Sequence, residues 1–269
     1  MQNGMSKIFV ILCVLSIDAS LADKNNESIV DITQNISTDS PCAEEGDTPY
    51  IKMYEAGNYR LLNSKLYPHV IYMTSFCSTC IAAPSFYEGN WHTVNSIDPK
   101  FLIGVNCYKI DISNGNHDNL AISLNDIKNF ENEYGEIQGG SVVVFFTGWS
   151  KYWERNNKRY INKHPVINLD AIEYLCSKGI AGIGIDAPSI DLKRDGFSSQ
   201  IALYNKGKYL IKNISEHANR IPAVGSKLVI APLKFEACNE APIRIYAVID
   251  HNKKNNTSIF KKIMKWLLS

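Results

Sequence analysis

The stretch Ser141-Val142-Val143-Val144-Phe145-Phe146 constrains the fold more than any other part of the chain. A half-exposed strand would alternate apolar and polar residues, so this continuous apolar run predicts a strand that is buried on both faces. Such a strand needs layers on either side, and a chain of 269 residues with 45% hydrophobic residues can supply them. The run therefore favours one domain of the α/β or α+β class.

Neighbouring segments agree with this class. Leu169 to Lys178 has the apolar spacing of a helix, with Asn168 as its cap and Gly179 as its end. Further strands are expected over 70–73, 101–110, 180–185, 228–231 and 243–248. The glycines of 179–184 do not have the spacing of a dinucleotide loop, and they enter a strand rather than open a helix, so no nucleotide is expected there.

The charge balance excludes two classes of protein. Lys and Arg number 28 and Asp and Glu number 27, which gives a net charge of +1. Intrinsic disorder needs low apolar content and high net charge, and this chain has neither. Binding to nucleic acid has no electrostatic basis at this net charge, so no nucleic-acid partner is expected.

The two ends differ from the body in composition. Residues 1–22 contain Lys7, the apolar run 8–17 and small residues before a cleavage point after Ala22, a pattern typical of a secretory signal peptide. An uncleaved anchor is the alternative, but the run is too short to span a bilayer. We therefore expect a secreted, extracellular or secretory-lumen protein with a flexible arm over 23–48 and a body over 49–250.

The basic, amphipathic tail over 251–269 leaves two readings open. It is either a terminal helix that packs on the body or on a partner subunit, or a helix that lies on a membrane surface. It is too short and too charged to cross a membrane.

Secretion gives the cysteines and the Asn-x-Ser/Thr sequons a meaning. Six cysteines remain after cleavage, and an even number in an oxidising compartment predicts disulfides, with the pairing left open: Cys42, Cys77, Cys80, Cys107, Cys176 and Cys238. A redox pair or a nucleophile at the Cys77–Cys80 motif is the less favoured reading, because neither a thioredoxin-like setting nor a paired His is evident. Five sequons predict N-glycosylation: Asn26, Asn35, Asn213, Asn255 and Asn256.

Four segments, taken together, resemble a known family. They are 83–91, 148–153, 182–191 and the pair 231–234 with 241–244, and they resemble the cyclase family, which includes kynurenine formamidase and isatin hydrolase. The resemblance covers roughly residues 48–250. It implies a single cyclase-like, kynurenine formamidase-like α/β domain with a mixed β-sheet and flanking helices, often assembled as a homodimer.

The family's metal motif reads H-x-G-T-H-x-D-x-P-x-H, and Thr79 and Pro84 match its T and P. By this resemblance, the positions of the metal ligands and of the acid/base groups are occupied by Phe76, Cys80, Ala82, Phe86, Gln200 and Lys212. Phe and Ala offer no lone pair, and Lys is a cation that repels a metal ion. We therefore expect no metal, no cofactor and no catalytic residues of the family's kind.

The replacements leave two readings of the former site. Its rings, with Trp91 and Trp149, either fill the space by core packing or line a pocket for an aromatic small ligand. The sequence thus predicts a secreted, glycosylated pseudoenzyme, not an enzyme, that binds a protein or a small ligand. The alternative is a kynurenine formamidase-like amide hydrolase, acting on substrates of the N-formylkynurenine class through a non-standard site.

Overall fold

The computed structural model of the chain describes residues 27–38, 40–41, 51–55, 59–61, 64–66, 69–87, 92–114, 118, 120–153, 157–192 and 196–251. Several sequence predictions lie outside these residues: the signal peptide over 1–22, the tail over 252–269, Cys42, Trp91 and the sequons at Asn26, Asn255 and Asn256. These stay predictions.

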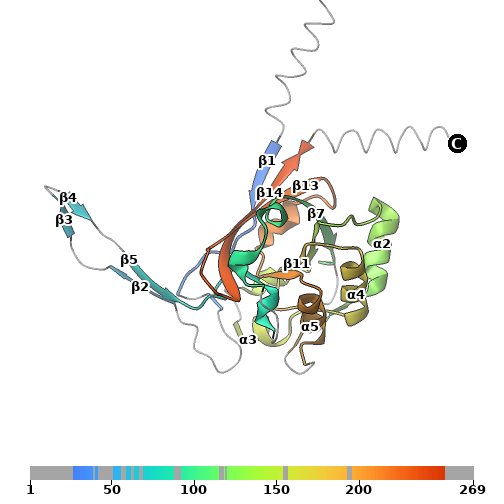
Figure 1. Cartoon of the computed structure of the whole chain (residues 1–269), viewed down its shortest axis with the longest axis horizontal. Helices are drawn as coiled ribbons and strands as arrows, with labels where there is room; N and C mark the ends of the chain where they lie inside the picture. Colours follow the sequence, from blue (N-terminus) through green and yellow to red (C-terminus); the bar gives the residue numbers. More distant parts are fainter. Residues whose placement is uncertain are drawn as a thin grey trace, which may run out of the picture.

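A mixed, eight-stranded sheet forms the centre of the fold (Figure 1). In spatial order its strands are β1 (Glu27–Asp31), β14 (Glu240–Asp250), β13 (Ser226–Pro232), β7 (Ile103–Asp111), β9 (Val142–Phe146), β11 (Gly182–Ile185), β12 (Tyr209–Lys212) and β6 (Cys80–Ala82). Strands β7, β9, β11 and β12 run parallel to one another, and the remaining pairings are antiparallel. The predicted α/β class with a mixed sheet is confirmed.

The short strand β6 closes this sheet on itself. One edge of β6 pairs with β12 and its other edge pairs with the first residues of β14. The rest of β14 pairs with β13 on one side and with β1 on the other. The strands from β14 through β12 are therefore closed into a ring by β6, which has three residues, whereas β1 pairs with β14 at the edge of this ring.

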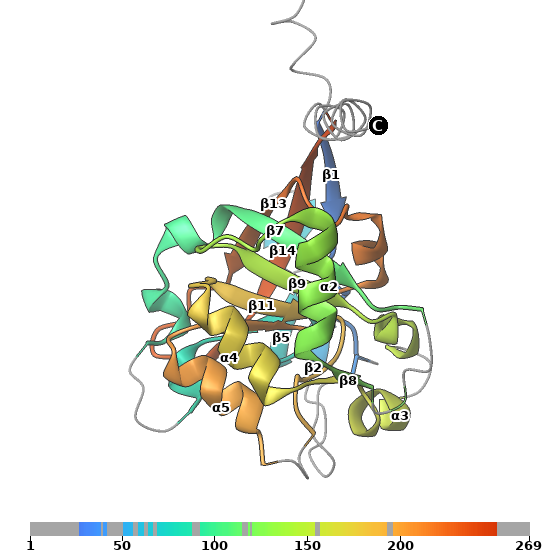
Figure 2. The ribbon, with the colours of Figure 1, turned by 90° about the vertical axis from the view of Figure 1, so that its right-hand side faces the viewer.

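Helices cover one face of the sheet. Figure 2 shows α2 (Leu124–Tyr134), α4 (Leu169–Ser177) and α5 (Ser198–Asn205) in front of the strands. The short α3 (Asn157–Asn162) contacts the 3-10 helix η5 (Trp149–Tyr152). The other 3-10 helices are η2 (Pro84–Phe86), η3 (Val94–Ser96), η4 (Pro99–Phe101) and η7 (Glu216–Arg220). Within the described part of the chain, no helix has the length and apolar character needed to span a membrane.

Three two-stranded ladders complete the structure. Strands β8 (Ala121–Ile122) and β10 (Val166–Ile167) form a parallel pair. The antiparallel pairs β2 (Ile51–Glu55) with β5 (His69–Met73) and β3 (Tyr59–Leu61) with β4 (Ser64–Leu66) form an arm that extends away from the body (Figure 1).

Strand β9 is buried on both faces, as its sequence predicts. Val142, Val144 and Phe146 belong to one core cluster, whereas Val143 and Phe145 belong to a second one on the other side of the sheet. The helix predicted over 169–178 is also confirmed: it ends at Ser177, and Gly179 follows with a φ of +74°. Asn168 stands at its N-terminal cap position, but the side chain of Asn168 makes no capping hydrogen bond. The buried strand thus separates two apolar layers.

The glycines that resemble a nucleotide loop serve close packing instead. Gly182 lies opposite Tyr209 in the parallel ladder. A Cβ atom on Gly182 would approach the Tyr209 ring to 2.3 Å, and one on Gly184 would approach Ile214 to 2.7 Å. Only glycine leaves room for these side chains over β11.

The predicted flexible arm over 23–48 is wrong for its described strand residues. Glu27–Asp31 form β1, which pairs along its length with the C-terminal half of β14. Ile32 follows with no exposed surface, and its backbone N–H donates to the carbonyl of Ile245 at 3.1 Å. Only two side chains of this segment, Val30 and Ile32, face the core. The residues around them are mostly polar, so the sequence does not show the alternation by which a strand is recognised.

We predict that Ile32→Ala lowers the free energy of unfolding by about 2–4 kcal/mol, because it leaves a cavity in the core. Ile36→Ala is the control, because Ile36 is 39% exposed on the same segment, and we expect a change of less than about 1 kcal/mol. Chemical denaturation of both variants measures the difference. Equal, small effects would show that this segment does not belong to the folded body.

Candidate functional site

Strand β6 brings together residues from three strands. Cys80 lies opposite Lys212 of β12 and opposite Pro242 of β14. Ala82 lies opposite Glu240 of β14. Residues two apart on a strand, and residues directly opposite across a ladder, point to the same face. The side chains of Cys80, Ala82, Lys212 and Glu240 therefore share one face of the closed sheet.

An ion pair spans β6 on this face. The Lys212 ammonium donates a hydrogen bond to Oε1 of Glu240, and the two side chains are only 12% and 5% exposed. Burial alone would lower the pKa of Lys212, but the Glu240 carboxylate outweighs burial and raises it above its usual value. Lys212 is therefore a fixed cation at neutral pH.

The Cys80 thiol lies beside this pair and is fully buried. Burial raises the pKa of Cys80 to about 12, although the charge of Lys212 acts in the opposite direction. Metal ligation and nucleophilic attack both need the thiolate. At neutral pH Cys80 is a neutral thiol, which disfavours the nucleophile and redox readings of the Cys77–Cys80 motif.

Helix α5 supplies the next residues of the site. The Gln200 amide donates to Ser189 Oγ at 2.8 Å and accepts from the Tyr204 hydroxyl at 3.5 Å. The Tyr204 ring lies 5.9 Å from the Phe86 ring, measured between centroids. Lys212 Nζ lies 5.5 Å from the centroid of Phe86. Hydrogen bonds and ring contacts therefore link Gln200 to the ion pair.

The structure thus gathers five of the six positions singled out in the sequence. They are Cys80, Ala82, Phe86, Gln200 and Lys212. Phe76 lies in the turn before β6 and is partly buried. We call Cys80, Phe86, Gln200, Tyr204, Lys212 and Glu240 the β6 cluster.

Sequence reasoning missed two members of the β6 cluster, Glu240 and Tyr204. A signal for Tyr204 was present, because it stands four residues after Gln200 on a helix and thus shares its face. A signal for Glu240 was also present, because a carboxylate at the start of an apolar strand is a candidate partner for a buried Lys.

Donors of the β6 cluster do not fit a divalent metal. A zinc site needs three or four thiolate, imidazole or carboxylate ligands. This cluster offers one thiol, one amide and one carboxylate that is already paired with an ammonium group. Across the described residues, no group of three or more His, Cys, Asp or Glu side chains is arranged to hold a metal ion.

Trp149 belongs to the core, so its predicted role as a pocket residue is not supported. It has no exposed surface, and its indole N–H donates to the carbonyl of Tyr160 at 3.0 Å. Its ring lies edge-on to Tyr152 at 4.7 Å. The backbone before it is held by Asp186, which accepts from Thr147 N and Oγ1 at 2.9 and 2.6 Å. At this position, the packing interpretation is the better one.

The predicted disulfide set is wrong for the cysteines that the structure describes. Cys77, Cys80, Cys107, Cys176 and Cys238 are not bonded to one another. Cys107 is buried in β7, and burial raises its pKa to about 12. These cysteines act as small apolar side chains in the core or at its edge. An even count of cysteines was therefore a weak argument, because none of the described ones is bonded to another.

Of the two described sequons, the structure contradicts the one at Asn213. Its side chain is 5% exposed, donates to the carbonyl of Ser78 at 2.7 Å and accepts from the Tyr160 hydroxyl at 2.8 Å. A glycan at Nδ2 would break the first bond and would need space inside the core. Asn35, in contrast, is exposed.

We therefore predict different outcomes for Asn35→Gln and Asn213→Gln in chains expressed in a secretory host. Asn35→Gln should remove one glycan without loss of stability. Asn213→Gln should leave the glycan mass unchanged but lower the free energy of unfolding by about 1–3 kcal/mol, because buried partners lose their hydrogen bonds. Intact mass spectrometry before and after deglycosylation measures the first effect. A glycan on Asn213 of the folded protein would contradict this account.

Comparisons with known proteins agree with the fold. The model of the cyclase family, described as "Putative cyclase", matches residues 30–192. Isatin hydrolase from Roseibium aggregatum is 33% identical over 134 residues, which cover 46% of this chain and 50% of that protein. The chain thus matches about half of the length of this relative. Kynurenine formamidase from Bacillus thuringiensis is 24% identical over 216 residues, which cover 80% of this chain and 94% of that protein.

Solved structures show the same architecture. An isatin hydrolase bound to the product analogue thioisatinate superimposes with a TM-score of 0.77 at 23% identity, over 88% of this chain and 98% of that chain. Isatin hydrolase A from Labrenzia aggregata, bound to benzyl benzoate, gives a TM-score of 0.75 at 25% identity, over 89% of this chain and all (100%) of that chain. These matches extend over both the sheet and its helices.

Proposed function

Because the chain belongs to the cyclase family, whose relatives named above are hydrolases, we propose that it is a pseudoenzyme of that family. It has lost metal-dependent hydrolysis and acts by binding a protein or a small ligand. It is secreted through its N-terminal signal and carries N-linked glycans on exposed sequons. The Lys212–Glu240 ion pair is the single observation that carries this proposal.

The argument from the ion pair is electrostatic. Two unit charges about 4 Å apart interact by about 4 kcal/mol at an effective dielectric constant of about 20, and a divalent ion doubles that repulsion. Lys212 therefore opposes a metal ion at this place. It also occupies the carboxylate of Glu240, the one strong anionic donor of the β6 cluster. Lys212 thus both repels a metal ion and pairs with the carboxylate that could bind one.

The edge of the β6 cluster supports a binding role. Phe86 is 46% exposed and Tyr87 is 40% exposed, so aromatic surface faces solvent next to the Lys212 cation. Exposed aromatic rings are the side chains most enriched at recognition surfaces. An aromatic ligand or a partner's aromatic side chain fits this surface by stacking.

Activity assays test the proposal. We expect the purified full chain, supplied with zinc or manganese, to release no kynurenine from N-formylkynurenine above a heat-treated sample. Turnover that is abolished by Cys80→Ala or by Lys212→Met would overturn the proposal and support a hydrolase with a non-standard site. As a test of binding, Phe86→Ala should weaken association with any ligand that co-purifies, whereas Phe101→Ala, an exposed ring outside the β6 cluster, should not.

A further inference from the structure

Strands β1, β14, β13 and β7 carry apolar side chains on their outer face. Ile29 lies opposite Val248, Val229 lies opposite both Tyr246 and Ile103, and each pair shares a face of the sheet. Ile29 is 69% exposed and Ile103 is 56% exposed. We call these five residues the outer apolar face.

Intervening residues on the same strands show which way this face points. Val30, Leu228, Ile245, Ala247 and Ile249 are buried in one core cluster. Because successive side chains of a strand alternate, the outer apolar face points away from that cluster. Asp31, Arg244 and Lys227 lie on the same side of the sheet, next to Tyr246 and Val248, so charged side chains border the outer apolar face. An exposed apolar patch with a polar rim is a typical site of docking.

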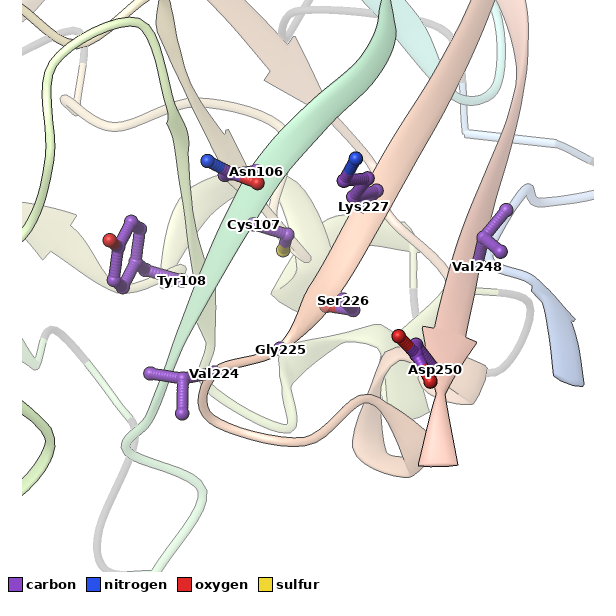
Figure 3. A pocket seen from close by; sticks show the side chains of 9 residues that line it. All are labelled: Asn106, Cys107, Tyr108, Val224, Gly225, Ser226, Lys227, Val248 and Asp250. Atoms are coloured by element: carbon purple, nitrogen blue, oxygen red, sulfur yellow. The ribbon is translucent and has the colours of Figure 1, made fainter. Parts of the chain in front are cut away.

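A hollow adjoins the outer apolar face near the end of β14. It has a volume of about 280 Å³, and Asn106, Lys227, Val248 and Asp250 are among the residues that line it (Figure 3). Figure 3 shows Lys227 on β13 and Val248 on β14 beside each other, with Asp250 at the end of β14. The described chain ends one residue later, at His251. The C-terminal tail therefore starts at the rim of the hollow.

The sequence of the tail suits this face. Apolar residues at Ile259, Phe260, Ile263, Met264 and Leu267 have the spacing of one side of a helix. Lys261, Lys262 and Lys265 fall on the opposite side. A ten-residue helix of this kind is only marginally stable in water by itself, so it needs a surface on which to fold.

The tail can also reach the face. The seven residues 252–258 span up to about 23 Å when extended. From Asp250 back to Tyr246 the strand covers about 13 Å, and a helix of ten residues is about 15 Å long. The polar linker Asn252-Lys253-Lys254-Asn255-Asn256 is rich in turn-forming asparagine. Length and composition thus permit the chain to turn back.

We propose that residues 259–268 form an amphipathic helix that packs on the outer apolar face of their own chain. Ile259, Ile263 and Leu267 cover the exposed Ile29 and Ile103, and the three lysines face solvent. The outer apolar face thus binds the C-terminal segment of its own chain, rather than a membrane surface or a second molecule of the protein.

Hydrogen–deuterium exchange on the full chain tests the proposal. We expect the amides of 259–268 to exchange at least about tenfold more slowly than unprotected amides. The variant Ile29→Glu/Ile103→Glu should remove that protection, because it places charges on the docking face. The control Met53→Glu/Ile71→Glu adds the same charge at exposed apolar positions on the arm, and should leave the protection intact.

A second variant guards against misfolding of the first. Ile263→Glu changes only the tail and should abolish its protection while the strands stay protected. Unprotected tail amides in the wild type would overturn the proposal, as would protection that persists in Ile29→Glu/Ile103→Glu. Protection that appears only with vesicles containing anionic lipid would assign the tail to a membrane. Protection that is lost on dilution would assign it to a second copy, and either result contradicts the proposal.

Discussion

Replacing Glu240 with leucine is expected to lower the free energy of unfolding by about 3–5 kcal/mol, because Lys212 would stay buried without its counter-ion. Both side chains of the pair are nearly inaccessible, so water cannot solvate the remaining ammonium group. Denaturant titration of the wild type and of the variant measures the loss.

The double variant Lys212→Met/Glu240→Leu should recover that loss. Apolar residues of similar volume avoid the desolvation of both charges, so replacement of a buried pair is often neutral or stabilising by about 1–4 kcal/mol. The control is Lys100→Ala, which breaks an exposed ion pair with Asp98 and should cost less than about 1 kcal/mol. If Glu240→Leu also costs less than that, the pair is not buried as described.

The pH dependence of this effect follows from the raised pKa of Lys212. A group whose pKa is raised on folding contributes stability below its unfolded value of about 10.4, and loses it only as the pH rises through the folded value. The wild type should therefore keep the contribution of the pair from pH 7 to pH 9. In Glu240→Leu, burial without the carboxylate lowers the pKa of Lys212, so the variant can lose this proton on folding and the cost of the substitution should fall between pH 7 and pH 9. A cost that stays the same over this range would mean that Lys212 remains charged without help from Glu240.

Trp149→Ala is the other change with a large expected effect, a loss of about 3–5 kcal/mol of stability. The side chain is fully buried, and its removal also leaves the Tyr160 carbonyl without the indole donor. The loss should appear in denaturant titration at neutral pH.

Two comparisons separate core packing from a pocket at Trp149. Trp149→Phe keeps most of the apolar volume and should lose less stability than Trp149→Ala. Phe86→Ala removes a half-exposed ring and should cost less still. If Trp149→Ala were tolerated and opened a site for aromatic ligands, the pocket reading of Trp149 would be right.

Long patterned elements could be predicted from the sequence, whereas the strands that close the sheet could not. The run over 141–146 and the helix after Asn168 each have a pattern that admits one interpretation. Strand β6 has only three residues, too few for an alternation to be recognised. Strand β12 has only four residues, which is also too short for a clear pattern. Strand β1 lies at the edge of the sheet and contains several polar residues, so its sequence does not look like that of a buried strand. Strands β6 and β12 form because partners on either side supply their hydrogen bonds, and β1 forms because β14 supplies them on one side.

The residues of the β6 cluster could likewise be predicted only in part, because some of them are brought together by strand pairing rather than by a local sequence pattern. Thr79 and Pro84 set the frame that pointed to Cys80 and Ala82, and the structure places both on one face of β6. Glu240 could not be assigned to that face, because only the register between β6 and the start of β14 brings it across to Lys212. Register depends on the closed sheet rather than on local sequence.

The metal content of the purified chain tests the central claim most directly. After incubation with excess zinc or manganese and removal of unbound ion, elemental analysis should find far less than one metal ion per chain, and Lys212→Met should not change that value. A stoichiometric ion that is lost in Cys80→Ala or Glu240→Leu would contradict the claim that the Lys212–Glu240 pair leaves no metal site in the β6 cluster.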